Sequence, residues 1–308
     1  MKHIVLAFVC ALAISIGTAQ TPVAQTESPD PNTLLWRVSG KNLSQPSYLF
    51  GTMHMLCAGG IELSDSLRGA IKAADAVYLE LDMENMQELM GVMARMRMNG
   101  DTTLKDLLSK DQYDSIRSFF ARKPGLIPFS MLEKFKPMLA ASALMEADME
   151  CENPVGMEQL IMKEAKREKR PVRGLETMAF QMSIFDSIPY TLQARQLLDY
   201  VQNYGNADAR REFEEMATAY VTQQLDKLES ITKRENMGIN QYMDLLLYRR
   251  NATWVAKLKE LMPGKSLVVA VGAGHLPGDK GVIALLRAAG YTVEPVANNM
   301  LKHLEKTL

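Results

Sequence analysis

Histidine and cysteine, the side chains that most often bind metals in proteins, are scarce in this chain of 308 residues, with four histidines and three cysteines. No H-E-x-x-H segment occurs, which excludes ordinary zincin chemistry. The formal net charge is −1, which offers no case for binding nucleic acid or acidic lipid. No second long apolar segment follows the N-terminus, so a membrane protein with several spans is excluded. The remaining balance, 47% hydrophobic and 23% charged residues, is that of a globular protein.

Residues 1–19 have the pattern of a secretory signal peptide. A small positive segment precedes an apolar core over residues 4–16, and small residues at 17–19 form a cleavage site. Cys10 lies inside that core after Val9, so a lipoprotein anchor is not expected. Residues 20–31 contain three prolines and predict a flexible leader. We therefore expect export to the periplasm or the extracellular space, with a single domain over residues 32–308.

Two cysteines, Cys57 and Cys151, remain after removal of the predicted signal peptide. A pair in an oxidising compartment often forms a disulfide, and two buried free thiols are the alternative. Cys57 lies three residues after His54 and could also bind a metal, but the spacing matches no zinc motif and this interpretation is less favoured.

A short apolar strand followed by G-x-x-H occurs twice, near the two ends of the chain. Each apolar run predicts a buried strand that turns sharply at the glycine and presents an imidazole at its end. The glycine would permit unusual backbone conformations and leave room for a ligand. The other two histidines are His3, in the predicted signal peptide, and His303, in the C-terminal tail, and no functional role is expected for them. The two units are Tyr48-Leu49-Phe50-Gly51-Thr52-Met53-His54 and Leu267-Val268-Val269-Ala270-Val271-Gly272-Ala273-Gly274-His275.

Two further predicted strands end in carboxylates. Residues 76–82 form an apolar strand that carries Glu80 and Asp82, and residues 171–177 end near Glu176. A helix over residues 64–74, with Leu67, Ala70, Ile71 and Ala74 on one face, precedes the first of them. Strand, helix and strand in succession predict a parallel crossover, which would place His54 and Glu80 at the same edge of a sheet.

The middle of the chain, residues 84–262, is mostly helical and rich in methionine, of which the whole chain has 22. A methionine-lined apolar groove for a peptide or lipid-like ligand is one interpretation, and ordinary helix packing is the favoured one. We therefore expect an α/β fold, with a mixed, mostly parallel central sheet flanked by helices and a large helical insertion. The expected helices cover residues 83–98, 103–108, 112–120, 131–147, 157–168, 192–200, 207–229, 239–259 and 281–289.

In an open α/β sheet the ligand site lies beyond the carboxyl ends of the strands, so His54, Glu80 and His275 could converge there. Two neutral imidazoles and a carboxylate would suit a divalent metal, which would activate water near neutral pH. Metal-free acid/base catalysis by a histidine oriented by Glu80 is the alternative. A pair of structural histidines is the non-functional interpretation.

The chain resembles the TraB/GumN family, which includes the PrgY and TIKI proteins. The resemblance spans almost the whole mature chain in family order. The matching segments are 47–54, 77–82, 173–177, Arg250-Asn251 with Trp254, 271–276, Gly278 and Gly290-Tyr291.

This resemblance implies a site of His54, His275 and Glu80, with Glu176 and Arg250 at further family positions. Arg250 would suit an oxyanion or a substrate carboxylate. The TIKI branch implies a metal-dependent protease favouring Mn²⁺ or Co²⁺, with Zn²⁺ also possible. A wider kinship with EreA-like esterases and haem-binding ChaN-like proteins implies an architecture of that kind.

Three hypotheses follow for the function. The leading one is an exported metal-dependent hydrolase of peptide bonds, in which His54, Glu80 and His275 hold the metal and Arg250 stabilises developing negative charge. The second is a protein that binds a peptide or haem-like ligand without turnover. The third is a metal-independent esterase that uses the same histidines and glutamate. The substrate and the oligomeric state are not predicted.

Overall fold

The computed structural model describes residues 32–57, 61–123, 128–147, 154–234 and 239–300, which belong to a compact unit spanning residues 31–308. The predicted signal peptide, the leader up to residue 31 and Cys151, with its expected disulfide, lie outside the described residues. None of the helices in the described ranges is long and apolar enough to cross a membrane.

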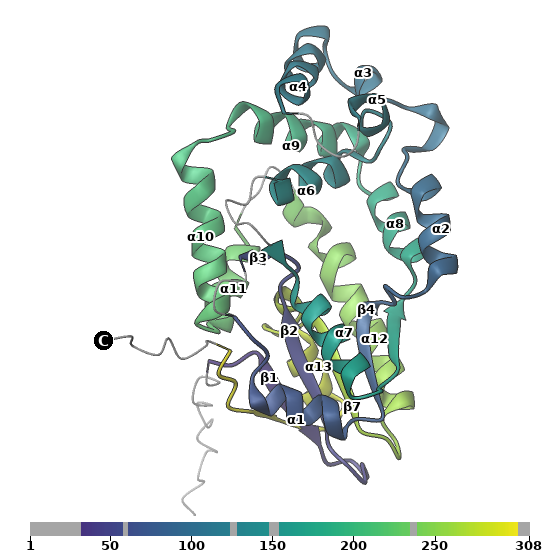
Figure 1. Cartoon of the computed structure of the whole chain (residues 1–308), viewed down its shortest axis with the longest axis vertical. Coiled ribbons are helices and arrows are strands. Elements are labelled where there is room, and N and C mark those ends of the chain that lie inside the picture. The colour runs from purple at the N-terminus through teal and green to yellow at the C-terminus, as the bar shows by residue number, and fades with distance from the viewer. Residues whose placement is uncertain (1–31, 58–60, 124–127, 148–153, 235–238, 301–308) are drawn as a thin grey trace, which may run out of the picture. The chain divides into compact units, whose positions relative to one another are not determined.

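A six-stranded mixed sheet forms the centre of the fold, in the spatial order β6-β4-β7-β2-β1-β8 (Figure 1). Neighbouring strands from β6 to β2 are parallel, and β1 is antiparallel to both β2 and β8. This matches the predicted mixed, mostly parallel sheet. The strands are β1 (Leu35–Ser39), β2 (Ser47–Thr52), β4 (Ala76–Leu81), β6 (Val172–Glu176), β7 (Leu267–Gly272) and β8 (Thr292–Pro295).

The central strands are apolar along their whole length because helices cover both faces of the sheet. In β7, Leu267 to Val271 are all buried. Helices α1 (Asp65–Ala73) and α7 (Met157–Arg167) pack against each other, and α12 (Arg249–Leu261) packs against α13 (Val282–Ala288). These two pairs lie on opposite faces of the sheet (Figure 1).

The predicted crossover between β2 and β4 is present, but β7 lies between these two strands. Helix α1 connects them and begins as predicted at Ser64, whose side chain accepts a hydrogen bond from the backbone N–H of Leu67. Ser64 Oγ also donates to Asn298 Oδ1 at 2.6 Å, so this cap is tied to the end of the described chain.

Most remaining helices lie between β4 and β7, as expected for a helical insertion. Five of them, with residues such as Ile116, Phe119 and Leu197, enclose a second apolar core apart from that of the sheet. The helices and short elements between β4 and β7 that are not yet named are α2 (Met86–Arg95), η1 (Asn99–Asp101), α3 (Leu104–Leu107), α4 (Lys110–Arg122), α5 (Phe129–Leu132), α6 (Pro137–Ala147), α8 (Met178–Asp186), α9 (Tyr190–Gln202), α10 (Ala207–Val221), α11 (Leu225–Thr232), η2 (Ile239–Tyr242) and η3 (Asp244–Tyr248). The short helix η4 (Ala273–His275) follows β7.

Three predicted helices are interrupted. The helix expected over residues 131–147 breaks before Pro137, which lacks the backbone N–H that a helix interior needs. The helix over 207–229 divides into α10 and α11 at Gln223, whose φ of 59° is left-handed. The segment over 239–259 contains a π-helical turn at Asp244–Tyr248 before α12 begins. Helix α8 and the two-residue strands β3 (Leu56–Cys57) and β5 (Pro154–Val155) are absent from the prediction.

The methionines of α2 and the residues before it are not packed in a core. Met86 and Met90 have exposed fractions of 66% and 80%, and Met83 and Met93 are also exposed. The favoured interpretation of ordinary helix packing is therefore wrong for these four side chains.

A buried polar cluster at the carboxyl edge of the sheet

Four neighbouring parallel strands deliver the predicted site residues to one edge of the sheet. In spatial order, Glu176 ends β6, Glu80 lies near the end of β4, His275 follows β7 and His54 follows β2. The strands are parallel, so their carboxyl ends meet at this edge, where open α/β sheets bind ligands. The predicted placement of His54 and Glu80 at a common edge is confirmed by this register.

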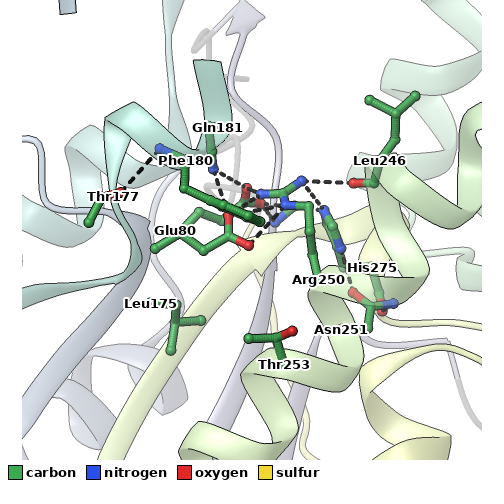
Figure 2. A network of polar contacts seen from close by, with 12 residues as sticks. Glu80, Leu175, Thr177, Phe180, Gln181, Leu246, Arg250, Asn251, Thr253 and His275 are labelled. Atoms are coloured by element: carbon green, nitrogen blue, oxygen red, sulfur yellow. Dashed lines mark hydrogen bonds and ion pairs between the residues drawn. The ribbon is translucent and has the colours of Figure 1, made fainter. Parts of the chain in front are cut away.

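Arg250, from the first turn of α12, is the centre of a network of ion pairs (Figure 2). Its Nη2 donates to Glu80 Oε2 at 2.5 Å and to Glu176 Oε2 at 2.9 Å, and its Nε donates to both Glu176 oxygens at 3.1 and 3.2 Å. Nη1 donates to the carbonyl of Leu246 at 2.9 Å, in the π-helical turn. Gln181 of α8 donates to both carboxylates at 3.2 Å. The guanidinium thus forms ion pairs with two carboxylates that are 12% and 4% exposed.

His275 lies in the same network and is 5% exposed. Its Nδ1 lies 2.6 Å from Asn251 Oδ1, which can only accept, so Nδ1 carries the proton and Nε2 the lone pair. Nε2 lies 3.2 Å from Arg250 Nη1 and 3.8 Å from Glu80 Oε1. Burial lowers the pKa of His275 to about 4, with Arg250 acting in the same direction and Glu80 opposing. The imidazole is therefore neutral near pH 7.

Glu80 is ionised despite its burial. Burial alone would raise its pKa, but the charges of His275 and Arg250 and the backbone N–H of Gly272, which donates at 2.8 Å to Oε1, lower it to about 2. Since His275 is neutral near pH 7, Arg250 is the cation that holds this carboxylate ionised there.

His54 has a different environment from His275. Its side chain is 68% exposed, and Nδ1 lies 2.7 Å from Oε1 of Glu158, which belongs to the first turn of α7. The close contact with Glu158 raises the pKa of His54 to about 9, with burial opposing. Glu80 raises and Arg250 lowers the same pKa, so His54 lies within electrostatic range of the cluster.

The glycines of the two G-x-x-H units serve close packing and not an unusual backbone conformation, since neither has a positive φ. A Cβ on Gly51 would lie 2.9 Å from Leu276 Cδ1 and 3.2 Å from the Cα of Ala273. A Cβ on Gly272 would lie 3.3 Å from Glu80 Oε1. The expectation of special conformations is wrong, and Gly272 leaves room for the carboxylate of Glu80.

Glu158 and Gln181 are the residues of this edge that sequence reasoning missed. Glu158 is one of several carboxylates in a predicted helix, and nothing local to it indicates a contact 104 positions back along the chain. Gln181 lies on α8, which was not predicted. Asp82 does not join the cluster, since its Oδ1 accepts from the backbone N–H of Glu84 and closes a turn.

The chemistry of the donors suits a divalent metal. Each histidine is contacted at Nδ1 by a side chain from another helix, and metal-binding histidines are usually held in this way. Glu80 supplies an ionised carboxylate beside them. The side chains of His54, Glu80 and His275 are farther apart than the ligands of a formed metal centre. Within the described ranges, no three His, Cys, Asp or Glu side chains are grouped closely enough to hold an ion.

The mixed sheet, the helices on both faces and the polar cluster at the carboxyl edge define an α/β protein whose cluster lies where sheets of this class bind ligands. The model of the TraB/PrgY/gumN family matches residues 34–295, and the chain belongs to this family. The match includes all the residues of the cluster.

Curated relatives extend this assignment. The chain is 23% identical to Metalloprotease TIKI2 of Danio rerio, with 89% of this chain and 62% of the relative covered, and 23% identical to Metalloprotease TIKI1 of Homo sapiens, with 90% and 64% covered. It is 25% identical to Uncharacterized protein YbaP of Escherichia coli (strain K12), with 78% and 87% covered. The chain thus spans less than two thirds of the length of these two metalloproteases.

Proposed function

We propose that the chain is a divalent-metal-dependent hydrolase that cleaves peptide bonds and is exported from the cytoplasm. The observation that carries the proposal is the pair of histidines, each held at Nδ1 by a side chain from another helix, beside an ionised carboxylate. Two relatives named as metalloproteases support it. The pattern of residues 1–19 supports export.

His54, Glu80 and His275 would hold the metal. When bound, the ion supplies Lewis-acid activation of water and of the scissile carbonyl, for which Mn²⁺, Co²⁺ and Zn²⁺ are candidates. Asn251 keeps His275 in the tautomer with an unprotonated Nε2. Glu176 and Gln181 hold Arg250 and Glu80 in place.

Arg250 would stabilise negative charge that develops on the substrate. Its guanidinium is fixed by two carboxylates and by the carbonyl of Leu246, so it would not need to reorganise during the reaction. Trp254 stacks near both the guanidinium, at 4.8 Å, and the imidazole of His275, at 4.5 Å between ring centroids, and excludes water from one side of the cluster.

A metal-independent hydrolase is a second candidate, and the position of Arg250 favours it. The guanidinium already contacts Glu80 and His275 Nε2, two of the three donors that a metal would use. In this case His54, which its pKa of about 9 keeps protonated near pH 7, would be a general acid and Glu158 would orient it.

The test uses the mature chain and a mixed peptide library read by mass spectrometry, with Mn²⁺, Co²⁺ or Zn²⁺ added singly and with EDTA. We expect cleavage with one of the metals, no cleavage in EDTA, and at least a 100-fold loss in His54→Ala, His275→Ala and Glu80→Gln. Glu294→Gln, an exposed carboxylate on β8 that pairs with Arg37, is the matched control and should keep full activity. Full metal-dependent cleavage by both histidine variants would refute the proposal, and cleavage that survives EDTA but needs both histidines would favour the second candidate.

A further inference from the structure

Helix α7 begins directly against the backbone that carries His54. The N–H of Met157 donates to the carbonyl of Met53 at 3.1 Å, and β3, just after Met53, pairs with β5, just before Met157. A Cβ on Gly156 would lie 2.6 Å from the carbonyl oxygen of His54, so only glycine lets the helix start so close. The first turn of α7 and the turn after β2 are therefore fixed relative to each other.

Glu158 extends from this fixed turn to the imidazole. Its carboxylate is 17% exposed, and Oε1 lies 2.7 Å from His54 Nδ1, whereas the imidazole itself is 68% exposed. An exposed histidine normally samples several rotamers, and a partner anchored by backbone contacts restricts that freedom. Asn251 of α12 contacts Nδ1 of the other G-x-x-H histidine at 2.6 Å, so each ring has a side-chain partner at this nitrogen, an amide for His275 and a carboxylate for His54.

We propose that Glu158 is a positioning residue that holds Nδ1 of His54 and thereby presents Nε2 to the carboxyl edge of the sheet. The contact between Glu158 and His54 does not depend on the proposed function. Its consequence for metal binding rests on the proposed function, because only a ligand or base at position 54 gains from a fixed Nε2.

Nuclear magnetic resonance of the ¹⁵N-labelled, metal-free mature chain tests the contact. A proton on Nδ1 that is shielded from exchange should give a signal, which His54→Ala identifies by removing it. We expect this signal to persist in Glu158→Gln, where an amide oxygen can accept, and to disappear in Glu158→Ala and in Glu158→Asp, whose carboxylate is one methylene shorter. The corresponding signal of His275 reports in each spectrum that the fold is intact, and Glu168→Gln on the same helix is the control.

Calorimetric titration with Mn²⁺ then tests the consequence. Glu158→Ala should weaken Mn²⁺ binding by about 10- to 100-fold, and Glu158→Gln should recover most of the affinity. A His54 signal that survives unchanged in Glu158→Ala and Glu158→Asp, or Mn²⁺ affinity equal to that of the wild type in Glu158→Ala, would overturn the positioning role. A wild-type chain that neither binds Mn²⁺ nor cleaves peptides would instead refute the proposed function, and the first result would still stand.

Discussion

Removing the guanidinium of Arg250 should destabilise the fold by an amount that depends on pH. Arg250→Met keeps much of the side-chain volume but leaves Glu80 and Glu176 without their cation, at 12% and 4% exposure. Breaking a buried ion pair by removal of one partner costs about 3–5 kcal/mol. The pKa of Glu80, which His275, Arg250 and the backbone N–H of Gly272 lower from the ordinary 4.5 to about 2, shows that this carboxylate is ionised in the fold.

The sign of the pH dependence follows from the direction of that pKa. Glu80 has a lower pKa folded than unfolded, so its contribution to stability is present above pH 4.5 and is lost as the pH falls toward 2. In Arg250→Met burial is no longer opposed by the guanidinium, and protonation relieves the buried charge. The difference in unfolding free energy between wild type and variant should therefore be largest at pH 7 and should shrink toward pH 3.

Urea unfolding in EDTA measures this difference. Trp254 and Trp36 are both buried and provide a fluorescence signal, although Trp254 also contacts the altered side chain, so circular dichroism should be recorded in parallel. Arg250→Lys restores a charge without the planar fork and should recover only part of the loss. A loss below about 1 kcal/mol at pH 7, or one that is equal at pH 7 and pH 4, would contradict the assignment of Arg250 as the cation that holds Glu80 ionised.

Three further changes test other parts of the fold and site. Gly51→Ala should lower the free energy of unfolding in urea by about 1–3 kcal/mol, because the added Cβ would lie 3.2 Å from the backbone of Ala273. Gly69→Ala on α1 is the control and should be neutral or stabilising, because nothing lies within 4 Å of its added Cβ. Equal effects of the two changes would contradict the packing argument. Ser64→Ala should cost about 1 kcal/mol by removing the N-cap of α1, and no change in the urea midpoint would count against that role. His275→Ala should lower the free energy of unfolding by about 2–4 kcal/mol, because it leaves the buried partners of the imidazole unsatisfied. His54→Ala should change it by less than about 1 kcal/mol, because the His54 side chain is 68% exposed. Similar losses in the two variants would be inconsistent with the different burial of the two histidines.

The edge of the sheet that carries the cluster could be predicted from local patterns. An apolar run into glycine predicts a strand end, and Ser64 before an amphipathic segment predicts the start of α1. The insertion of β7 between β2 and β4 could not be predicted, because it depends on pairing between segments about 220 residues apart, such as Tyr48 with Val268. Such pairing depends on the summed packing of both faces and leaves no local signal.

The breaks in the predicted helices differ in how visible they are. Pro137 is a signal in the sequence, and the predicted helix should have been divided there. Gln223 adopts a left-handed conformation, and no neighbouring glycine or proline predicts it. Tertiary contacts therefore determine the break between α10 and α11. One such contact is the bond from Gln223 Nε2 to the carbonyl of Asn298, which ties the turn to the end of the described chain.

The two G-x-x-H units give similar sequence patterns but histidines of opposite character. His275 is buried, and burial lowers its pKa to about 4, whereas His54 is exposed and contact with Glu158 raises its pKa to about 9. Sequence cannot separate them, because the difference comes from the helices that pack on each turn, α12 with Asn251 in one case and α7 with Glu158 in the other. A buried neutral imidazole can only accept or bind through Nε2, while an exposed imidazole can also exchange protons with solvent. The repeat therefore supplies two imidazoles, and the helix that packs on each turn determines the burial and the pKa of its histidine.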